Sequence, residues 1–459
     1  MGGHRHHAAV LRFQTLIPFL SALSLFPVFC FMSRTPPFLL AVLWQLSTSL
    51  YAGDAVPNSI NAGTEAAAPN AAAQSGRNIR VGMEAKTIRE AIKMAQPGDT
   101  IHLEPIVYHD YAGFYGKKGE LGKPVTLDGH GATLEGSDPI DLEKWSELEP
   151  GLFANDELLP RLDEAIISRW FFIWNGKMNR MGRTSKGKKA PFKKPRELQP
   201  GEWTFVVDTE RSKTPAKQLF GTFYLKLIPG QKLADANIAA PMRSGGVQMG
   251  GNNAHLIIKN ITATHPYNDG FNIHGDCRDV VFENIRAIEC GDDGISAHES
   301  AEYRVDGLVS IGNSTGITDT VAAHTSYKNV FIADCQAYDL FFLNNGRYRV
   351  ENAVVWSTAE HPLSVSAGGN EHVELDLKNV FIRRANKPEP ALVQKTATLR
   401  AAQITLENME MTIQGLVSFD NCVINGRMLP EGATATGADK KTLIEQLVPA
   451  AYQSQFQNP

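Results

Sequence analysis

The sequence lacks the features of several common protein classes. It has only five cysteines; Cys30 lies in the leader, and Cys277, Cys290 and Cys422 do not have the spacing of a metal site. The formal net charge is −4, which does not favour a nucleic-acid partner. The dense leucine framework of a leucine-rich-repeat horseshoe is missing. These absences direct attention to the pattern that the chain does repeat.

Long apolar runs are also scarce, and the two near the start, residues 12–32 and 37–46, do not clearly reach the length of a membrane-spanning helix. The segment that begins at Met32 has the pattern of a complete signal peptide by itself, which predicts a start at Met32 and cleavage near Ala52 or Ala55. A membrane anchor is the alternative. We expect a secreted or periplasmic protein with no membrane span in the mature chain.

A short pattern of an apolar residue, any residue, Asn, Asp or Gly, and a second apolar residue recurs through the second half of the chain. Its intervals of roughly 20 to 30 residues indicate a solenoid in which each repeat is one coil. Asn suits such a register because it tolerates left-handed backbone and its amide can bond to the Asn of the next coil. We therefore predict an all-β fold, a right-handed parallel β-helix, with an inward column of Ile261, Ile285, Leu308, Cys335, Val380 and Met409.

The solenoid is expected to carry additions at both ends and one insertion. Residues 86–96 place their apolar residues on one face, which predicts an N-terminal capping helix. The repeat lapses in the middle of the chain, and residues 440–451 are expected to form a short helix that closes the far end. The boundaries are 1–52 for a targeting region, 53–78 for a flexible, disordered linker, 79–136 for the cap and first coils, 137–245 for an inserted subdomain, 246–430 for the main coils, and 431–459 for a C-terminal cap or tail.

Polar residues gather at one register about eight residues after each repeated Asn. Residues 268–274 read Asn-Asp-Gly-Phe-Asn-Ile-His, and residues 292–298 of the next coil read Asp-Asp-Gly-Ile-Ser-Ala-His. With Phe271, Ile295, Ile317 and Leu363 inward, period-two alternation places equivalent polar residues of adjacent coils on the outer face, about 4.8 Å apart. We expect one exposed patch of candidate catalytic residues, Asp269, Asp292, Asp293, His274 and His298. Candidate substrate contacts are Asn268, Asn272, Ser296, Glu299, Arg347 and Arg349.

Three clustered carboxylates shift one another's pKa values, so that one stays protonated while another stays ionised, as acid–base catalysis at a glycosidic bond requires. Two other interpretations stay open. The Asp residues would serve their own turns, since Asp-Gly is a turn former. Alternatively they would hold a metal ion, with Ca²⁺ on the carboxylates or a transition ion on the two histidines. No other cofactor is expected.

The helix that ends in Pro-Gly-Asp-Thr-Ile (residues 97–101), followed by coils that carry Asn, resembles the pectin-lyase-like superfamily of right-handed β-helices over about residues 80 to 430, the insertion apart. Within it, Asn268-Asp269-Gly270 and Gly291-Asp292-Asp293 are similar to the Asn-x-Asp and Asp-Asp motifs of the polygalacturonase group. The resemblance implies that Asp292 or Asp293 is the general acid and that the remaining carboxylates activate water. Where that group has Gly-His-Gly and Arg-x-Lys, this chain has Gly312-Asn313-Ser314 and Arg347-Tyr348-Arg349.

We therefore expect an exported monomer that cleaves an acidic polysaccharide by hydrolysis at its aspartates. One alternative is a polysaccharide lyase with His274 or His298 as base and Arg347 or Arg349 beside the uronate carboxylate. The other is a non-catalytic surface or adhesion β-helix. The expected partner is an anionic polysaccharide and no nucleic acid. Residues 177–196 hold nine Lys or Arg and no Asp or Glu, which indicates a solvated loop or a surface that attracts a polyanion.

Overall fold

The computed structural model describes residues 76–158, 163–187, 189–213, 219–368, 371–386 and 389–457. The predicted targeting region and all but the last three residues of the predicted linker lie outside these ranges. Those last three residues belong to the fold and correct the linker boundary, because Arg77 pairs with Asp99 at 2.6 Å and Asn78 begins the first strand. Within the described ranges, no helix is long and apolar enough to span a membrane.

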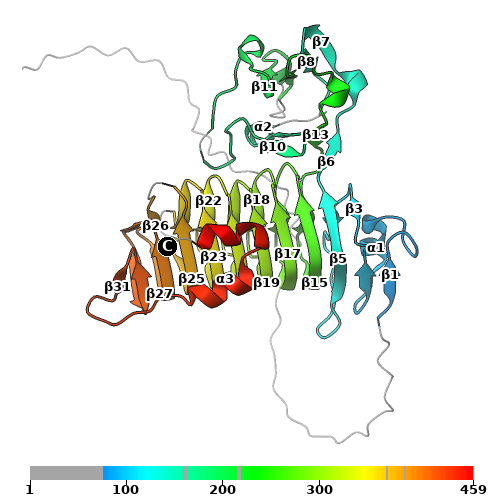
Figure 1. Cartoon of the computed structure of the whole chain (residues 1–459). Coiled ribbons are helices and arrows are strands. Elements are labelled where there is room, and N and C mark those ends of the chain that lie inside the picture. Colours follow the sequence, from blue (N-terminus) through cyan, green and yellow to red (C-terminus); the bar gives the residue numbers. More distant parts are fainter. Residues whose placement is uncertain are drawn as a thin grey trace, which may run out of the picture. The chain divides into compact units, whose positions relative to one another are not determined.

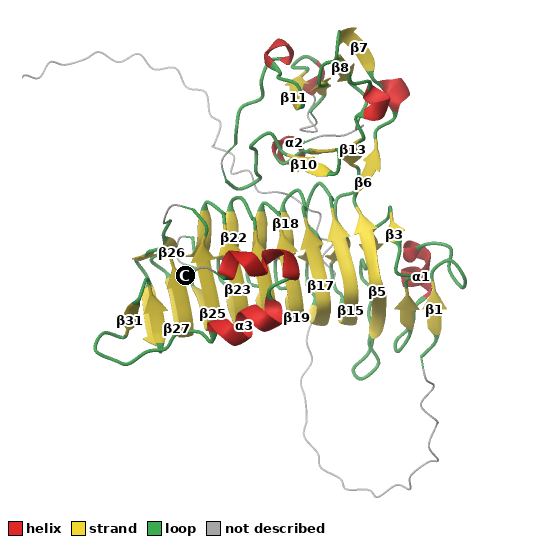
Figure 2. Ribbon diagram, in the orientation of Figure 1, coloured by secondary structure: helices red, strands yellow, loops and turns green. Residues whose placement is uncertain are grey.

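The predicted right-handed parallel β-helix is confirmed: successive coils stack through two extended parallel sheets (Figures 1 and 2). The larger, which we call the long sheet, contains β1 (Asn78–Arg80), β2 (Thr100–His102), β3 (Val107–Tyr108), β5 (Val125–Glu135), β15 (Ala254–Thr264), β17 (Arg278–Ile288), β19 (Glu302–Ile311), β21 (His324–Ala333), β23 (Arg347–Ser357), β25 (Val373–Arg384), β27 (Ala397–Glu407), β29 (Leu416–Asp420), β30 (Cys422–Ile424) and β31 (Arg427–Leu429), the last pair antiparallel.

The smaller sheet, which we call the short sheet, contains one strand from most of the same coils. Its strands are β4 (Ala112–Gly113), β14 (Val247–Gly250), β16 (Phe271–His274), β18 (Asp293–Ala297), β20 (Thr315–Asp319), β22 (Tyr338–Leu343), β24 (His361–Ser366), β26 (Ala391–Val393) and β28 (Met411–Ile413). The inward side chains of both sheets form one continuous apolar core that runs the length of the solenoid.

One residue in the middle of each long-sheet strand from β15 to β25 adopts the left-handed conformation. Asn260, Asn284, Asn329, Asn352 and Asn379 have φ between 51° and 57°, and Gly307 holds the same place in its coil. Their amides bond from coil to coil, as from Asn284 to Asn260 at 3.0 Å and from Asn379 to Asn352 at 2.9 Å. Asn is common here because its short polar side chain tolerates left-handed backbone. The ladder that the repeat predicts is therefore present.

The predicted inward column is right for four of its six members. Pairing aligns Ile261, Ile285, Leu308, Val330, Ala353, Val380 and Ile404. Cys335 and Met409 are buried but do not belong to this column. The reason is that several coils have a second left-handed residue, at the end of the long-sheet strand, and Asp334 and Asn408 are the residues of this kind that precede Cys335 and Met409. The same four-residue pattern therefore marks two different turns.

The N-terminal end is covered by α1 (Ile88–Met94), which buries Ile88, Ala91 and Ile92. Thr87 caps the helix by accepting a hydrogen bond from the Glu90 backbone N–H at 3.1 Å. The observed helix is the predicted cap, shorter than residues 86–96 because the chain turns at Ala95. Its packing keeps the apolar end of the first coil out of water.

Between β5 and β14 the chain forms two small antiparallel sheets instead of coils. One contains β6 (Ser137–Pro139), β9 (Phe172–Trp174), β10 (Lys177–Asn179) and β13 (Ile238–Pro241), and the other β7 (Ser146–Glu149), β8 (Leu152–Asn155), β11 (Glu202–Val207) and β12 (Gly221–Lys226). Short helical turns connect them, namely α2 (Glu164–Ser168), η1 (Leu142–Lys144), η2 (Pro195–Glu197), η3 (Arg211–Lys213) and η4 (Leu233–Asp235). An aromatic core of its own, with Trp170, Phe172, Trp203 and Phe223, holds this insertion together.

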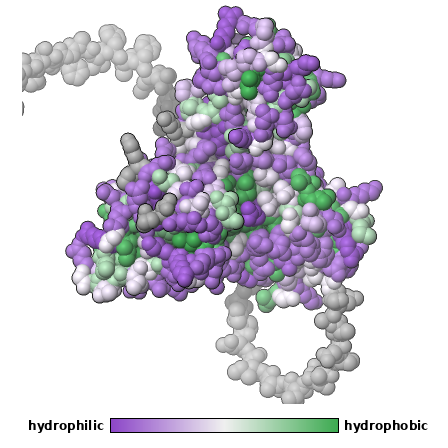
Figure 3. All heavy atoms as spheres, in the orientation of Figure 1, coloured by the Kyte–Doolittle hydropathy of each residue, from purple (hydrophilic) through white to green (hydrophobic). Residues whose placement is uncertain are grey.

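The C-terminal helices do not close the far end of the solenoid, which corrects the prediction for residues 440–451. Instead, α3 (Lys440–Leu447) and η5 (Ala450–Phe456) lie on the outer face of the long sheet (Figure 1). That face is apolar where they pack, because Phe331, Val354 and Phe381 point outward there and bury Leu443 and Phe456. Figure 3 shows apolar side chains gathered on this face of the solenoid, whereas the insertion is mostly polar.

An ion-pair ladder joins three coils at the second turn, where the chain leaves for the insertion. His265 lies between Glu135 and Glu289, with Nδ1–Oε2 and Nε2–Oε2 distances of 3.0 and 3.1 Å. Burial opposes the charge on this imidazole, but its hydrogen bonds to the two carboxylates outweigh burial and raise the pKa of His265 to about 9.

The raised pKa predicts a pH-dependent stability. The ladder's contribution is fully present below the unfolded pKa of about 6.5 and is lost as pH rises through about 9. We expect the melting temperature of the wild type to fall as the pH rises over that interval. His265→Gln should lack this part of the fall, because it has no imidazole to lose its proton. The wild type should therefore lose up to about 3 kcal/mol more unfolding free energy than the variant between the two pH values. His324→Gln, at an exposed histidine of β21, is the control. Parallel curves for wild type and His265→Gln would contradict the prediction.

Candidate active site

The outer face of the short sheet carries columns of aligned polar residues. Phe271, Ile295, Ile317 and Leu363 are buried in the core as predicted. Between them, one outward column runs through five coils in the order Gln248, Asn272, Ser296, Thr318 and Phe341. A second column begins with His274 and His298, whose rings stack with centroids 4.1 Å apart and planes inclined by 3°. The strand register thus brings Asn272 to Ser296 and His274 to His298. Ser296 and Thr318 are buried, with exposures of 0% and 2%, so the prediction of Ser296 as an exposed substrate contact is wrong, because its hydroxyl bonds to Asp269 instead.

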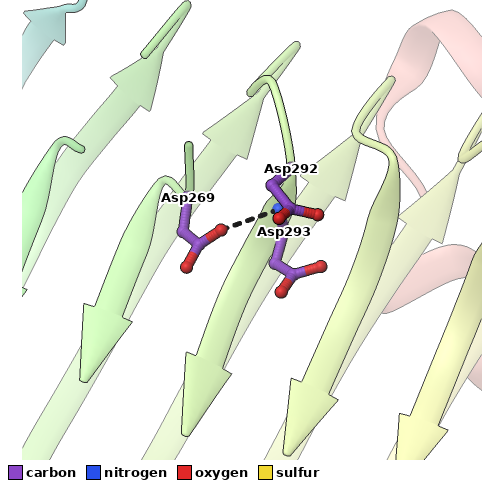
Figure 4. Close-up of side chains that lie close together, drawn as sticks. All are labelled: Asp269, Asp292 and Asp293. Carbon is purple, nitrogen blue, oxygen red and sulfur yellow. Dashed lines mark hydrogen bonds between the residues drawn. The ribbon is translucent and has the colours of Figure 1, made fainter. Parts of the chain in front are cut away.

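The three aspartates also meet (Figure 4), since the structure places an oxygen of each within 4.8 Å of the others. Asp269 precedes β16, Asp292 precedes β18, and Asp293 is the first residue of β18. They are not exposed, however: their relative exposures are 3%, 7% and 2%. The expectation of an open carboxylate patch is therefore wrong, and the reason is that the insertion lies against them.

Two of the aspartates bond to the neighbouring coil. Asp269 accepts hydrogen bonds from the Asp293 backbone N–H at 3.0 Å and from Ser296 Oγ at 2.8 Å. Asp293 accepts one from Thr318 Oγ1 at 3.0 Å. These bonds repeat one motif, in which an aspartate just before a strand or at its first residue accepts from a hydroxyl of the next coil. Asp269 therefore has a structural role at its turn as well as a place in the cluster.

The insertion supplies the cations of the site. Lys186 Nζ lies 2.7 Å from Asp292 Oδ1 and 2.6 Å from Asp293 Oδ1, and Arg169 Nη1 lies 2.9 Å from Asp292 Oδ2. The Ser185 hydroxyl also donates to Asp292. Buried Arg180 ties the insertion to the same turn by donating to the carbonyl oxygens of Gly291, at 2.7 Å, and Cys290. The sequence offers one signal for the contacts of Lys186 and Arg180, the basic run 177–196; this run does not include Arg169 and does not show which of its members is buried.

The charges separate the protonation states of the aspartates. Burial raises the pKa of each carboxyl, but Lys186 and Arg169 outweigh burial at Asp292 and hold its pKa well below the ordinary value. Burial, together with the negative charge of Asp292, raises the pKa values of Asp269 and Asp293. Lys186 stays charged because the aspartates more than offset its own burial and raise its pKa. The cluster thus contains an ionised Asp292 beside carboxyls that favour the proton.

The two histidines differ from the aspartates in exposure and charge. Both are partly exposed, and His274 Nδ1 lies 3.1 Å from Glu299 Oε2. Burial, followed by the nearby charge of His274, lowers the pKa of His298 to about 4. His298 is therefore a neutral imidazole at neutral pH, and it is close enough to Lys186 and Asp292 for their charges to act on it.

The remaining predicted contacts divide between two faces. Asn268, at the turn before Asp269, lies near the cluster, but Arg347 and Arg349 lie on β23 of the long sheet, exposed, with Arg349 paired to Glu351 at 2.9 Å. Their assignment to this site is corrected, because half a coil of chain separates the strands of the two sheets. Asn313, in the place of the expected histidine, is a core amide that accepts from the Cys290 N–H at 2.7 Å and donates to the Ala287 carbonyl at 3.0 Å.

A metal ion does not fit this arrangement. Three carboxylates are ligands that Ca²⁺ prefers. Here, however, the ammonium group of Lys186 already contacts Asp292 and Asp293. The guanidinium group of Arg169 also contacts Asp292. The side chains therefore form an ion cluster in which cations of the protein already contact the carboxylates.

No family model and no curated relative match this sequence. Solved structures with a similar chain path include XylC in complex with xylose, at 10% identity and a TM-score of 0.41, covering 73% of this chain and 70% of that one. An alginate lyase from Paenibacillus sp. str. FPU-7 has 9% identity and a TM-score of 0.35, covering 76% and 99%. A family 28 exopolygalacturonase from Yersinia enterocolitica has 11% identity and a TM-score of 0.31, covering 75% and 78%. These likenesses concern the fold.

The ion cluster generates a stability prediction. Removal of one partner of a buried ion pair leaves the other charge uncompensated, so Lys186→Met should lower the unfolding free energy by roughly 3 kcal/mol at pH 7. Because the pKa of Asp292 is depressed, its contribution is present above the unfolded value of about 3.8 and is lost as pH falls below it. The difference between variant and wild type should therefore shrink near pH 3. Lys189→Met, at an exposed lysine of the same segment, is the control, and an equal effect of both variants would refute the prediction.

Proposed function

We propose that this protein cleaves a polysaccharide by acid–base hydrolysis at the aspartate cluster. One observation carries the proposal: carboxyls from adjacent coils lie within 4.8 Å of one another, and their surroundings push their pKa values in opposite directions. A pair of carboxyls separated in this way supplies an acid and a base at one pH. Asp292 and Lys186 retain side-chain exposures of 10% and 23%, so the cluster reaches solvent through them.

The roles follow from the protonation states. Asp293 gives its proton to the glycosidic oxygen, and Asp292 takes a proton from water. The water oxygen bonds to the anomeric carbon as the bond from that carbon to the glycosidic oxygen breaks. Lys186 Nζ lies against both carboxyls, so a substrate oxygen reaches Asp293 only when the ammonium leaves that residue. Asp269 positions Asp293 through the bond to its backbone N–H.

Aromatic side chains on the same face support a carbohydrate ligand. Tyr338 and Phe341 of β22 stack with centroids 4.0 Å apart and planes inclined by 6°, and both are partly exposed. Phe341 belongs to the same outward column as Ser296, two coils away, which corresponds to about 10 Å along the solenoid. A flat aromatic surface at that distance suits a sugar ring beside the cleaved bond. The predicted leader supports action outside the cytoplasm.

A polysaccharide lyase is the second candidate, and His298 favours it. A neutral imidazole is ready to take the proton beside a uronate carboxylate. Lys186 and Arg169, rather than the predicted Arg347 and Arg349, are the cations that contact the aspartate cluster. In this reaction His298 removes the proton, the electron pair forms a carbon–carbon double bond, and the glycosidic oxygen leaves with its electrons.

A screen of the purified protein against uronate, sulfated and neutral polysaccharides tests the proposal. New reducing ends without ultraviolet absorbance indicate hydrolysis, whereas an absorbing unsaturated product indicates the lyase. Binding of a polymer with no product from any of them would overturn both and favour a non-catalytic solenoid.

Variants then locate the chemistry. Asp293→Asn resembles the protonated carboxyl that the site already favours, so we expect a melting temperature near wild type and a turnover lowered by about 10² or more. Asp279→Asn, at a partly exposed aspartate of the long sheet that pairs with His255 and Arg304, is the matched control. Wild-type turnover in Asp293→Asn would remove the aspartate from the mechanism. A lower melting temperature with unchanged turnover per folded molecule would assign it to the structural ladder.

His298→Ala separates the two reactions. If the lyase reading holds, its turnover should fall by about 10² or more; under hydrolysis it should change much less. Because the pKa of His298 is about 4, a lyase would lose activity only as pH falls toward 4, where the imidazole gains its proton. A pH profile of kcat/KM measures this, and an activity limit near pH 6.5 would contradict the assignment of His298 as base.

A further inference from the structure

A basic hollow lies at the N-terminal end of the short sheet, where α1 and the segment after β4 meet. It has a volume of about 380 Å³ and is lined by Arg89, Lys93, Lys117 and Lys118, with no carboxylate among its lining residues. None of these four cations forms an ion pair with a residue of the described ranges. On a chain whose net charge is −4, such a concentration of one sign marks a local field that attracts anions.

Two of the cations are held in place by neighbours. Lys117 Nζ donates to the carbonyl oxygens of Lys93 and Ala95 at 3.2 and 2.9 Å, at the C-terminal end of α1. An ammonium has three donors, so one remains after these bonds. Arg89 Nη2 donates to Tyr111 Oη at 2.7 Å, and its guanidinium lies 5.6 Å from the centre of that ring. Capping of the C-terminal end of α1 accounts for the position of Lys117, but it does not account for a positive charge at Arg89 or Lys118.

The hollow is continuous with the outward column of the short sheet. Tyr115 lines it, is 59% exposed, and donates its hydroxyl hydrogen to Gln248 Oε1. Gln248 pairs with Asn272 and Asn272 with Ser296, which bonds to Asp269. The hollow, on the coil of β4, therefore lies at the end of a row of polar side chains that reaches Ser296 and the turn of Asp292 after three coil steps, or about 14 Å.

We propose that this hollow is a subsite for an anionic substituent, a carboxylate or a sulfate ester, on a polysaccharide that lies along the short sheet. The proposal rests on the proposed function, since the same chain would present its glycosidic bond to the aspartates. An extended polymer on the row places a charged group among Lys93, Lys117 and Lys118 while a sugar about three coils away, or about 14 Å, reaches Asp292. Fixed cations favour this because they lose little side-chain freedom on binding.

The test measures binding in the Asp293→Asn background, where turnover is low. The pocket variant is Lys93→Gln with Lys118→Gln, since both side chains are exposed and neither donates to the backbone contacts above. The control, Lys86→Gln with Lys328→Gln, removes the same charge elsewhere on the surface. Calorimetric Kd values are taken for oligogalacturonate, dextran sulfate and uncharged dextran, and melting temperatures confirm folding. We expect the pocket variant to bind one or both anionic polymers about tenfold more weakly, while the control stays within about twofold.

The outcomes separate this subsite from the proposed function. A loss for oligogalacturonate alone assigns a carboxylate, and a loss for dextran sulfate alone assigns a sulfate ester. Equal Kd values in the pocket and control variants overturn the subsite even if the wild type cleaves a polymer. A pocket-dependent loss in a protein that cleaves nothing keeps the subsite and overturns the proposed hydrolysis. A loss of equal size for uncharged dextran also overturns the subsite, because it would show that charge is not what the hollow recognises.

Discussion

Parallel pairing between successive coils is the constraint on which the other features depend, and a left-handed residue in each coil keeps that pairing in register. At Asn260, Asn284, Asn329, Asn352 and Asn379 the backbone takes a conformation in which a bulky or β-branched side chain would be strained. Except between Asn284 and Asn329, where Gly307 takes the place in the coil between them, each amide lies about one strand spacing from the next, so the ladder adds side-chain hydrogen bonds to those of the backbone. Residues at equivalent positions of successive coils therefore stack into columns, either on the surface or in the core.

The same repetition creates an electrostatic problem on the short sheet. Aspartates at equivalent turns of adjacent coils fall within 4.8 Å of one another, where like charges repel. Two kinds of interaction stabilise the aspartates against this repulsion. Hydrogen bonds from Ser296, Thr318 and the backbone satisfy the carboxyls, and Lys186 and Arg169 compensate the charge. The result is an ionised Asp292 next to carboxyls that favour the proton, an arrangement with more chemical use than three equal carboxylates.

The insertion is therefore part of the site. Its aromatic core makes it a stable unit, and Arg180 fastens it to the turn that carries Asp292. From there Lys186 lies over the cluster, while the column from Gln248 to Phe341 stays on the outer face of the sheet. Aromatic side chains lie at one end of this column and a basic hollow at the other, with the aspartates between them. The proposed substrate path and the proposed anion subsite both follow from this linear order.

Local rules in the sequence were enough to predict the β-helix, the helix cap, the Asn ladder and the stacking of His274 on His298. Those features depend on period-two alternation and on backbone conformation, which a few neighbouring residues decide. The sequence misplaced Cys335 and Met409 because a second turn, at Asp334 and Asn408, has the same residue pattern as the turn in the middle of the long-sheet strand. Only the tertiary structure decided that α3 covers an apolar stretch of the long sheet, that Arg347 and Arg349 face away, and that the aspartates are buried. Lys186 lies 106 residues from Asp292 in the chain, and its segment has no repeat that fixes a register. The sequence of a basic run does not show which of its side chains contact water and which contact a carboxylate. The pairing of Lys186 with Asp292 is therefore set by packing between distant segments.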